Sequence, residues 1–456
     1  MENLMDKIVS LSKRRGFVYA SSEIYGGFSA IYDYGPYGVE LENAVKREWW
    51  RAMVQEREDI VGLDSSIFMS PKIWVASGHV GGFSDPLAEC KNCHARVRVD
   101  HLLNDLDVVA DEKMTVEDIN NLFIVHKDRI ACPTCGNKNF SDVKTFNLLV
   151  KSNLGNFTED YTSDPVYLRG ETCQGIYVNF KNVLNSTRVK IPFGIAQIGK
   201  SFRNEITARQ FLFRTREFEQ MEMQYFVHPD TEMDHYEKCR QLRWQYYLDM
   251  GVREENLKWH KHENLVFYAK EAYDIEYNFP FGFKELEGIH ARGNYDLTQH
   301  SKHSGKDLSY VDPVAGGKYL PHIVETSVGV GRTVFMLLAD AYHEEEVAGE
   351  TRVVLKFHPK MAPVKVAILP LMKKRELAQP AHEIFDTLKK KFLCEYDETQ
   401  SIGKRYRRQD EIGTPFCVTF DYESIDDKKV TIRERDSMKQ ERVAIADLEN
   451  YFSGRF

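Results

Sequence analysis

The sequence lacks long hydrophobic runs. No stretch of its 456 residues approaches the roughly 18 consecutive apolar residues of a membrane-spanning helix. The opening segment MENLMDKIVSLSKRRG mixes charges with its apolar positions and has no apolar stretch before a small-residue cleavage site, unlike a secretory signal. We therefore expect a cytoplasmic protein that does not engage a membrane.

Internal repeats and low-complexity linkers are also missing, which excludes solenoid and fibrous architectures. The hydrophobic content of 42% over this length allows two to four globular domains. The formal net charge is −8, from 61 Lys+Arg against 69 Asp+Glu. This charge argues against indiscriminate nucleic-acid binding but permits local basic patches.

Cysteine is scarce, with eight residues, and half of them form two CxxC pairs. In a reducing compartment such pairs hold metal more often than they form disulfides. Cys90, Cys93, Cys132 and Cys135 supply four thiolates, so we predict a structural zinc site with no open position for water. The alternatives are four unliganded thiols, or attachment of a c-type haem at CKNCH, which normally accompanies export.

Apolar spacing predicts the order of elements along the chain. We expect helices over 3–15 and 37–58, antiparallel strands within 175–226, a helical section over about 229–270, strands over 273–289, and a strand that turns at Gly329 and Gly331 into an apolar helix. After FHPKMAP, strands alternate with helices, which predicts a small α/β domain.

Residues 194–201, GIAQIGKS, match the phosphate-loop pattern GxxxxGK[ST], so a P-loop nucleotidase is a competing hypothesis. A phosphate loop needs a preceding hydrophobic strand and a helix that opens at the Lys-Ser pair. Here Pro192 precedes the motif closely and a strand-loop-strand pattern follows it. The context argues against the P-loop interpretation.

The strongest chemical pattern is FRNE at 202–205 followed by FRTREFEQMEMQYF at 213–226. We expect two strands joined by a short hairpin, whose alternation lets six residues share one face, namely Arg203, Glu205, Arg214, Arg216, Phe218 and Glu222. An arginine fork donates two hydrogen bonds to a phosphate, and a phenylalanine ring stacks on a purine. The alternative for any single residue is a surface hairpin with salt bridges.

Together these residues resemble motif 2 of class II aminoacyl-tRNA synthetases. GVGR at 329–332 resembles motif 3, and LDSSIFMSPKIW at 63–74, with the helix before it, resembles the dimer-forming motif 1. The closer resemblance is to the homodimeric type of glycyl-tRNA synthetase, through YDYGPYGVEL, ETCQGIYVNF, GKSFRNE, FRTREFEQME, KELEGI and GKRYRRQDEIGTP. It covers nearly the whole chain except the Cys-flanked insertion.

The resemblance implies an α+β catalytic domain, an antiparallel sheet flanked by helices, over residues 1–345. Residues 85–151 would be an inserted zinc subdomain and about 229–270 a helical insertion. Residues 360–456 would form a C-terminal α/β anticodon-binding domain.

The resemblance also implies the roles of individual residues. Arg203, Glu205 and Arg332 would be catalytic. The ATP site would comprise Arg203, Asn204, Glu205, Phe213, Arg214, Arg216, Phe218, Glu285, Leu286, Gly329, Gly331 and Arg332, with Mg²⁺ bound to the phosphates near Glu285. The glycine site would comprise Arg98, Glu171, Phe218, Glu222, Glu325 and Ser327. Structural ion pairs are the alternative for the three glutamates.

We therefore expect an enzyme that activates glycine with ATP and transfers it to the 3′ end of tRNA(Gly), as a homodimer formed through motif 1. Lys404, Arg405, Arg407 and Arg408 surround Tyr406 and would bind the tRNA, although a solvated helix face is the alternative. Family analogy alone suggests diadenosine tetraphosphate synthesis as a side activity. The competing functions are a synthetase-like RNA-binding or regulatory protein without activation, and a related synthetase for another amino acid.

Overall fold

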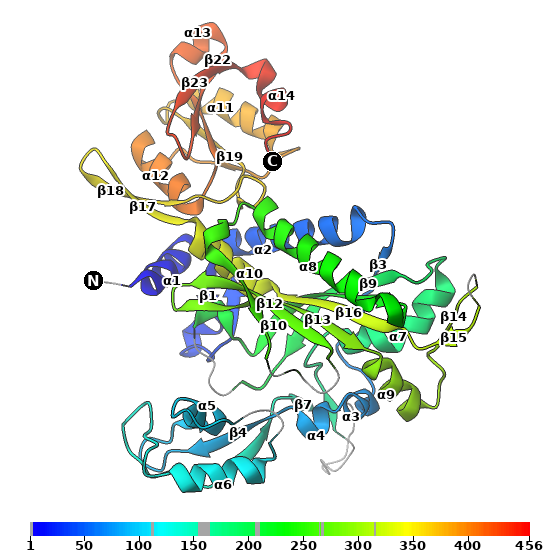
Figure 1. Ribbon diagram of the computed structural model, residues 1–456. Coiled ribbons are helices and arrows are strands. Elements are labelled where there is room, and N and C mark those ends of the chain that lie inside the picture. The colour runs from blue at the N-terminus through cyan, green and yellow to red at the C-terminus, as the bar shows by residue number, and fades with distance from the viewer. Residues whose placement is uncertain are drawn as a thin grey trace.

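The computed structural model describes residues 3–110, 114–153, 165–205, 210–263, 265, 269–313 and 316–456. Three parts are visible in Figure 1, with a large central sheet between a C-terminal lobe and a small Cys-containing lobe. In the described part of the chain, no helix combines the length and apolar character that a membrane crossing requires.

A seven-stranded sheet forms the centre of the molecule. Its strands, in spatial order, are β11 (Leu257–Lys261), β12 (Glu271–Phe279), β13 (Gly282–Gly293), β16 (His322–Gly329), β10 (Glu217–Val227), β9 (Phe193–Phe202) and β3 (Ile60–Gly62). All neighbours pair antiparallel except β3, which runs parallel to β9. This arrangement confirms the predicted antiparallel sheet flanked by helices.

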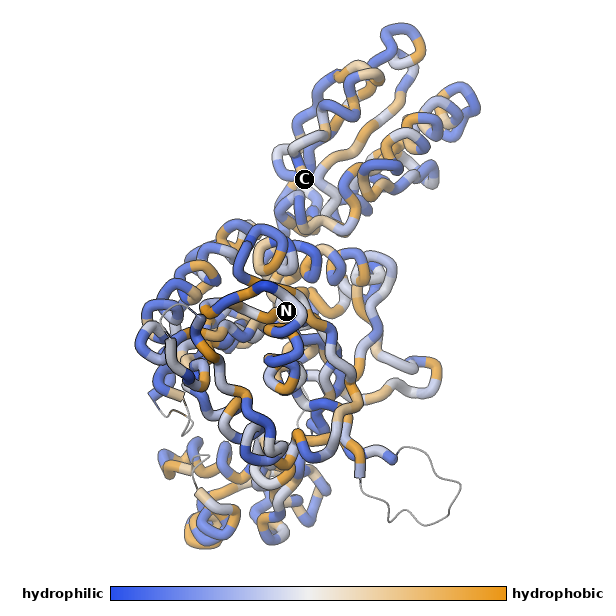
Figure 2. Tube along the Cα trace, turned by 90° about the vertical axis from the view of Figure 1, so that its right-hand side faces the viewer, coloured by the Kyte–Doolittle hydropathy of each residue, from blue (hydrophilic) through white to orange (hydrophobic). Residues whose placement is uncertain are grey.

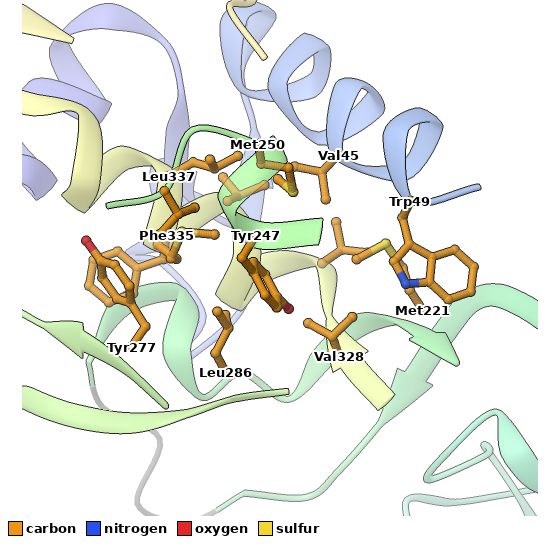
Figure 3. Packing of buried hydrophobic residues seen from close by; sticks show 14 of the residues in the cluster. Val45, Trp49, Met221, Tyr247, Met250, Tyr277, Leu286, Val328, Phe335 and Leu337 are labelled. Atoms are coloured by element: carbon orange, nitrogen blue, oxygen red, sulfur yellow. The ribbon is translucent and has the colours of Figure 1, made fainter. Parts of the chain in front are cut away.

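Helices cover both faces of this sheet. The larger core lies against α1 (Leu4–Arg15), α2 (Pro36–Trp50), α8 (Glu232–Asp249) and α10 (Val330–Ala341). Figure 3 shows Trp49 of α2, Tyr247 of α8 and Phe335 of α10 meeting side chains from the sheet. A second apolar cluster joins the opposite face to α7 (Cys173–Ser186) and α9 (Tyr295–Ser304). The sheet is therefore buried on both sides.

Local sequence explains where the first helix begins and ends. The Asn3 side chain accepts a hydrogen bond from the Asp6 amide at 2.9 Å, which caps the amino end of α1. Gly16 ends the helix with φ of 75°, a left-handed conformation that glycine adopts without steric cost. The predicted helix over 3–15 is confirmed, and the one over 37–58 is shorter, running from Pro36 to Trp50 and continuing as a π-helical segment to Gln55.

Two predicted elements are wrong in part. The segment at 175–186 is not a strand, because it belongs to α7, whose buried Ile176, Tyr177, Phe180 and Val183 recur at helical spacing. The section over about 229–270 is helical only as far as Asp249, and β11 then adds an edge strand to the sheet. The strands over 273–289 and the turn from β16 into α10 are confirmed.

The Cys-containing lobe has a small core of its own, made of apolar side chains between 88 and 140. It contains β4 (Ser84–Glu89), β5 (Arg96–Arg98), β6 (Lys144–Asn147), α5 (Val99–Asn104) and α6 (Val116–His126). These strands form a three-stranded antiparallel sheet with β4 in the middle.

The C-terminal lobe is a five-stranded mixed sheet with helices around it, which confirms the predicted α/β pattern. Its strands, in spatial order, are β20 (Cys394–Tyr396), β19 (Val366–Pro370), β21 (Phe416–Phe420), β22 (Lys429–Glu434) and β23 (Gln440–Ala444). Its helices are α11 (Arg375–Leu388), α12 (Ile402–Ile412), α13 (Glu423–Asp427) and α14 (Leu448–Phe452). Figure 2 shows from the side that this lobe projects from the rest of the molecule.

Short elements complete the chain. They are β1 (Val18–Ala20), β2 (Tyr32–Tyr34), α3 (Pro71–Ala76), α4 (His79–Gly82), β7 (Lys151–Ser152), β8 (Val166–Tyr167), β14 (Tyr310–Val311), β15 (Lys318–Tyr319), β17 (Tyr342–Val347) and β18 (Glu350–Leu355), with short 3-10 turns at 23–25, 211–213, 229–231, 254–256 and 445–447. The hairpin β17–β18 precedes the C-terminal lobe and contacts α12.

Candidate active site

Three buried or half-buried glutamates meet on one face of the central sheet. Glu222 lies on β10 opposite Ser327 of β16, and Glu325 lies opposite Gln224. Because side chains alternate along a strand, Glu222 and Glu325 point to the same face. Glu171 approaches from the turn before α7, the helix that covers this face.

Glu222 is surrounded by hydrogen-bond donors. Its Oε1 accepts from the Ser327 hydroxyl at 2.7 Å and from Gln220 Nε2 at 2.9 Å, and its Oε2 accepts from the Thr172 hydroxyl at 2.6 Å. Burial raises the pKa of Glu222 to about 8, and the charges of Glu325 and Glu171 add to the effect. A cation placed here would favour the ionised form.

Glu325 has the opposite electrostatic setting. Burial alone would raise its pKa, but the Arg292 guanidinium and His290 outweigh it and hold the pKa at about 2. Its Oε1 lies 3.2 Å from Arg292 Nη1 and 2.9 Å from His290 Nδ1, and its Oε2 accepts from Gln224 Nε2 at 2.8 Å. Glu325 is therefore a fixed negative charge.

Glu171 is also held ionised. Burial opposes its charge, but His79, whose Nε2 lies 3.2 Å from Oε1, brings its pKa well below the usual range. Gln174 Nε2 donates to the same oxygen at 2.9 Å. Two ionised carboxylates, Glu171 and Glu325, thus lie beside Glu222, which a bound cation would ionise, in a site enclosed by polar side chains and suited to a small cation.

A second group of residues brings two arginines to one carboxylate. Arg332, on α10, donates to the Phe213 carbonyl at 3.1 Å and lies 3.0 Å from Glu285 Oε1, and its guanidinium stacks over the Phe213 ring at 4.5 Å. Arg203 lies over the Phe218 ring at 5.3 Å. Arg332, and to a smaller extent Arg203, hold the pKa of Glu285 below its usual range.

The other predicted ATP residues flank this group. Arg203 donates through Nε to the Gly170 carbonyl at 3.1 Å, and the Asn204 amide donates to the Leu148 carbonyl at 2.8 Å. Arg216 Nε donates to the Glu205 carbonyl at 2.9 Å. Arg214 Nη1 lies 4.0 Å from Glu205 Oε2.

The strand placement of this motif is corrected by the structure. Strand β9 ends at Phe202 and β10 begins at Glu217, so of the six predicted residues only Phe218 and Glu222 lie on a strand. The others, Arg203, Glu205, Arg214 and Arg216, lie in the connection between the strands, whose residues 206–209 are outside the described ranges.

Glycines and an apolar residue shape the same region. Gly329 begins the turn into α10, and a Cβ on Gly331 would lie 3.4 Å from the Leu212 carbonyl oxygen and the Tyr34 hydroxyl. Leu286, next to Glu285 on β13, points into the core. It therefore supports the site from behind rather than facing it.

Arg98 lies apart from the three glutamates. It ends β5 in the Cys-containing lobe, where Nη1 is 2.9 Å from Asp85 Oδ1 and Nε donates to Asp100 Oδ1 at 3.1 Å. Burial lowers the pKa of Arg98, but the pairs with Asp100 and Asp85 outweigh it and raise the pKa above its usual value. The charge of Glu205 adds to this increase. In this conformation Arg98 therefore faces the arginine-rich connection.

The four paired cysteines converge as the spacing predicts. The Sγ atoms of Cys90 and Cys135 are 3.6 Å apart, as are those of Cys93 and Cys132, and all four lie within 4.8 Å of one another. A tetrahedral ion with metal–sulfur bonds of about 2.3 Å needs sulfurs roughly 3.8 Å apart. The cluster fits a metal ion held by four thiolates, and the CKNCH thiols face the second pair rather than a haem.

The basic residues of α12 divide into two kinds. Arg405 is only 1% exposed and donates to the carbonyls of Pro370, at 2.5 Å, and Leu371, at 3.1 Å, so it does not face solvent. Arg408 pairs with Asp397. Lys404 is exposed and Arg407 is half-buried. The expectation that all four present free charge to RNA is wrong for Arg405, because its guanidinium joins α12 to β19.

The phosphate-loop match has a simple structural outcome. Residues 194–201 lie inside β9 of the central sheet, between β10 and the short edge strand β3, and pair along their length with β10. The glycine-rich loop and following helix that a P-loop needs are replaced by an extended strand. The P-loop interpretation is therefore wrong.

Several partners of the glutamates were not predicted as site residues from the sequence. They are Thr172, Tyr177, Gln220, Gln224, His290 and Arg292. The alternation QMEMQ over 220–224 was the available signal, since it places Gln220, Glu222 and Gln224 on one face.

Comparison with known proteins agrees with this arrangement. Residues 156–341 match the model of the tRNA synthetase class II core domain (G, H, P, S and T), and residues 365–455 match the anticodon binding domain. The chain is 52% identical to a glycine–tRNA ligase of Acetivibrio thermocellus, over 100% of this chain and 99% of that protein. It is 53% identical to those of Caldanaerobacter subterraneus (98% and 97% covered) and Treponema denticola (97% and 95% covered). The chain belongs to the class II glycyl-tRNA synthetase family.

Proposed function

We propose that this protein activates glycine with ATP, forming glycyl-adenylate and pyrophosphate, and transfers glycine to the 3′ end of tRNA(Gly). The observation that carries the proposal is the enclosed set of Glu171, Glu222 and Glu325 beside the arginines Arg203 and Arg332. The carboxyls suit an ammonium group and the arginines suit a triphosphate.

The mechanism needs no side-chain nucleophile. The glycine carboxylate attacks the α-phosphorus of ATP and the bond to pyrophosphate breaks. Arg203 neutralises charge that develops on the α-phosphate, while Arg332 and Phe218 hold the adenine between them. A terminal tRNA hydroxyl then attacks the glycyl carbonyl and AMP leaves. Proximity and charge stabilisation account for the catalysis.

Magnesium fits next to Glu285. The side chain of Glu285 is 50% exposed and stays ionised beside Arg332. Mg²⁺ commonly binds through one or two carboxylates together with substrate phosphates. When bound, it supplies positive charge to the phosphates.

Direct measurement of ATP–pyrophosphate exchange with each amino acid separately tests the proposal. We expect exchange with glycine alone, followed by aminoacylation of tRNA(Gly). Exchange with another amino acid would identify a related synthetase. RNA binding without any exchange would favour the regulatory alternative.

We also propose the domain limits and assembly. The catalytic domain spans 1–345, with insertions at 85–151 and about 229–270, and the anticodon-binding domain spans 360–456. Two copies would associate through motif 1, which covers α2, β3 and the start of α3. The protein would act in the cytoplasm. As a side activity, diadenosine tetraphosphate would form when a second ATP attacks the phosphorus of the adenylate and glycine leaves.

The cysteine cluster is proposed to hold one structural Zn²⁺ per chain, because four thiolates at this spacing close a tetrahedron. Protein purified without added metal is expected to contain one zinc per chain. Elemental analysis of Cys93→Ser should then show its loss. Cys394→Ser is the matched control, because Cys394 lies in the C-terminal lobe. Absence of zinc together with failure to bind it afterwards would contradict the proposal.

The exposed face of α12 is proposed to contact tRNA through Lys404 and Arg407, with Arg408 at its edge and Arg405 holding the helix in place. Replacing Lys404 and Arg407 together with alanine should leave exchange within about twofold but lower aminoacylation by about tenfold, since phosphate contacts are lost. The salt dependence of tRNA binding should weaken as well. The control is Lys389→Ala with Lys390→Ala, which removes equal charge from the same lobe. Equal loss of both activities would argue against a separate tRNA-binding lobe.

A further inference from the structure

Three potential metal ligands gather at one end of the central sheet, apart from the cysteine cluster. They are His262, just after β11, Asp274 on β12 and His290 on β13, and one ligand atom from each lies within 4.8 Å of the others. The His262 amide donates to the Ala272 carbonyl at 3.1 Å, and His290 lies opposite Ala272. Asp274 is two residues beyond Ala272, so all three side chains project from the same face.

Small residues leave space between these ligands. Ala272 separates the two histidines, and Gly288 lies opposite Asp274. A Cβ on Gly288 would lie 2.9 Å from Cε1 and 3.2 Å from Nε2 of His290, and 3.6 Å from Asp274 Oδ1. A side chain at 288 would therefore fill the space into which these groups point.

The orientation of His290 suits a metal ligand. Its Nδ1 is 2.9 Å from Glu325 Oε1, which leaves Nε2 on the side of Gly288 and Asp274. Metal-binding histidines almost always donate their second ring N–H to a carboxylate or carbonyl, which fixes the ring. His262 Nε2 already lies 2.8 Å from Asp274 Oδ2. One carboxylate and two imidazoles thus converge, with a further carboxylate behind one ring.

We propose that His262, Asp274 and His290 form a second metal site, which binds a divalent transition metal ion such as Zn²⁺. Two imidazole nitrogens and one carboxylate are ligands that this class of ion prefers. Three protein ligands leave at least one position for water, in contrast to the closed set of four thiolates.

A metal ion here is coupled to the glycine site, a consequence that rests on the proposed function. His290 Nδ1 already donates a hydrogen bond to the ionised carboxylate of Glu325, and a metal ion bound at Nε2 adds positive charge behind that carboxylate. Glu325 then attracts the glycine ammonium less strongly. By linkage, glycine weakens metal binding by the same factor. A metal ion bound at this site therefore inhibits glycine binding.

Titration with Co²⁺ of protein that holds one Zn²⁺ per chain, at the cysteine cluster, tests the site, because the visible absorption of Co²⁺ differs between thiolate and imidazole ligands. We expect one further Co²⁺ per chain, without the thiolate-to-metal charge-transfer band of a cysteine site. His262→Ala and Asp274→Asn should each weaken this binding at least tenfold. Gly288→Ala should do the same by filling the space while every ligand remains. His303→Ala, at an exposed histidine of α9, is the matched control and should bind normally.

Failure of the wild type to take up a further ion, or equal binding by all of these variants, would overturn the site. For the coupling, saturating Zn²⁺ should raise the glycine KM several-fold and leave the ATP KM unchanged, and the change should disappear in Asp274→Asn. Metal binding without any change in glycine KM would overturn the proposed inhibition of glycine binding. Absence of glycine exchange before metal is added would instead count against the proposed function, since the metal titration does not depend on activity.

Discussion

Replacing Arg203 with alanine is expected to lower glycine-dependent pyrophosphate exchange by about 10²- to 10³-fold while the protein stays folded. This loss is typical when one donor that stabilises transition-state charge is removed. Arg203 lies over the Phe218 ring and acts electrostatically on Glu285, so it faces the region where we place ATP. The change removes a phosphate-binding fork rather than core volume.

Two variants sharpen this test. Arg203→Lys keeps the charge but loses the planar fork, so its exchange should fall between those of the wild type and the alanine variant. Arg188→Ala removes an exposed arginine ahead of β9 and should behave as the wild type. Circular dichroism and the mass in solution show whether each variant keeps its fold and assembly. Near-normal exchange by Arg203→Ala would refute the assignment of this site to ATP.

Changing Glu222 or Glu325 to glutamine is expected to lower kcat/KM for glycine on the order of a hundredfold or more, with the ATP KM changed less than about twofold. Loss of one partner of a buried charge pair typically costs about 2 to 5 kcal/mol, while the amide keeps the shape of the site. Glu219→Gln is the matched control, because Glu219 is on the same strand but pairs with Lys46 on the other face. Unchanged glycine kinetics in both variants would refute the pocket.

The glutamine variants also test how larger amino acids are excluded. Glycine offers no side chain, so the site must recognise its ammonium and carboxylate groups. The pocket must also leave no space beside the α-carbon for a larger side chain. Exclusion by clash exceeds the roughly 1 to 3 kcal/mol available from attractive contact with one methylene. Alanine and serine should therefore remain poor substrates of the wild type and of both variants. Efficient alanine activation by the wild type would contradict this account.

The raised pKa of Glu222 is expected to make glycine binding depend on pH. With a pKa of about 8, set by burial and by Glu325 and Glu171, Glu222 is mostly protonated at neutral pH when the site is empty. The glycine ammonium pairs with the ionised form, so a proton leaves on binding. Glycine KM should therefore fall as pH rises toward 8, by up to about tenfold per pH unit. Glu222→Gln should lack this slope, whereas Glu325, already ionised, contributes none.

Sequence spacing predicted much of the fold because its strongest signals are local. The cap at Asn3, the glycine at 16 and the strand-to-helix turn at Gly329 depend on neighbouring residues only. The prediction of a strand over 175–186 was wrong because glycine and aromatic residues there obscure the helical spacing of the apolar positions. The buried face of α7 is defined only by its packing on the sheet.

The sequence by itself determined the residue types of the site, the cysteine pairs and the family resemblance. The tertiary structure decided the charge state of each carboxyl, because Glu222 and Glu325 have the same chemistry and opposite pKa shifts. It also decided that Arg405 is buried and that His262, Asp274 and His290 meet. These outcomes depend on the strand register and on which chain segments exclude water, and such long-range contacts are set only when the sheet and its covering helices assemble.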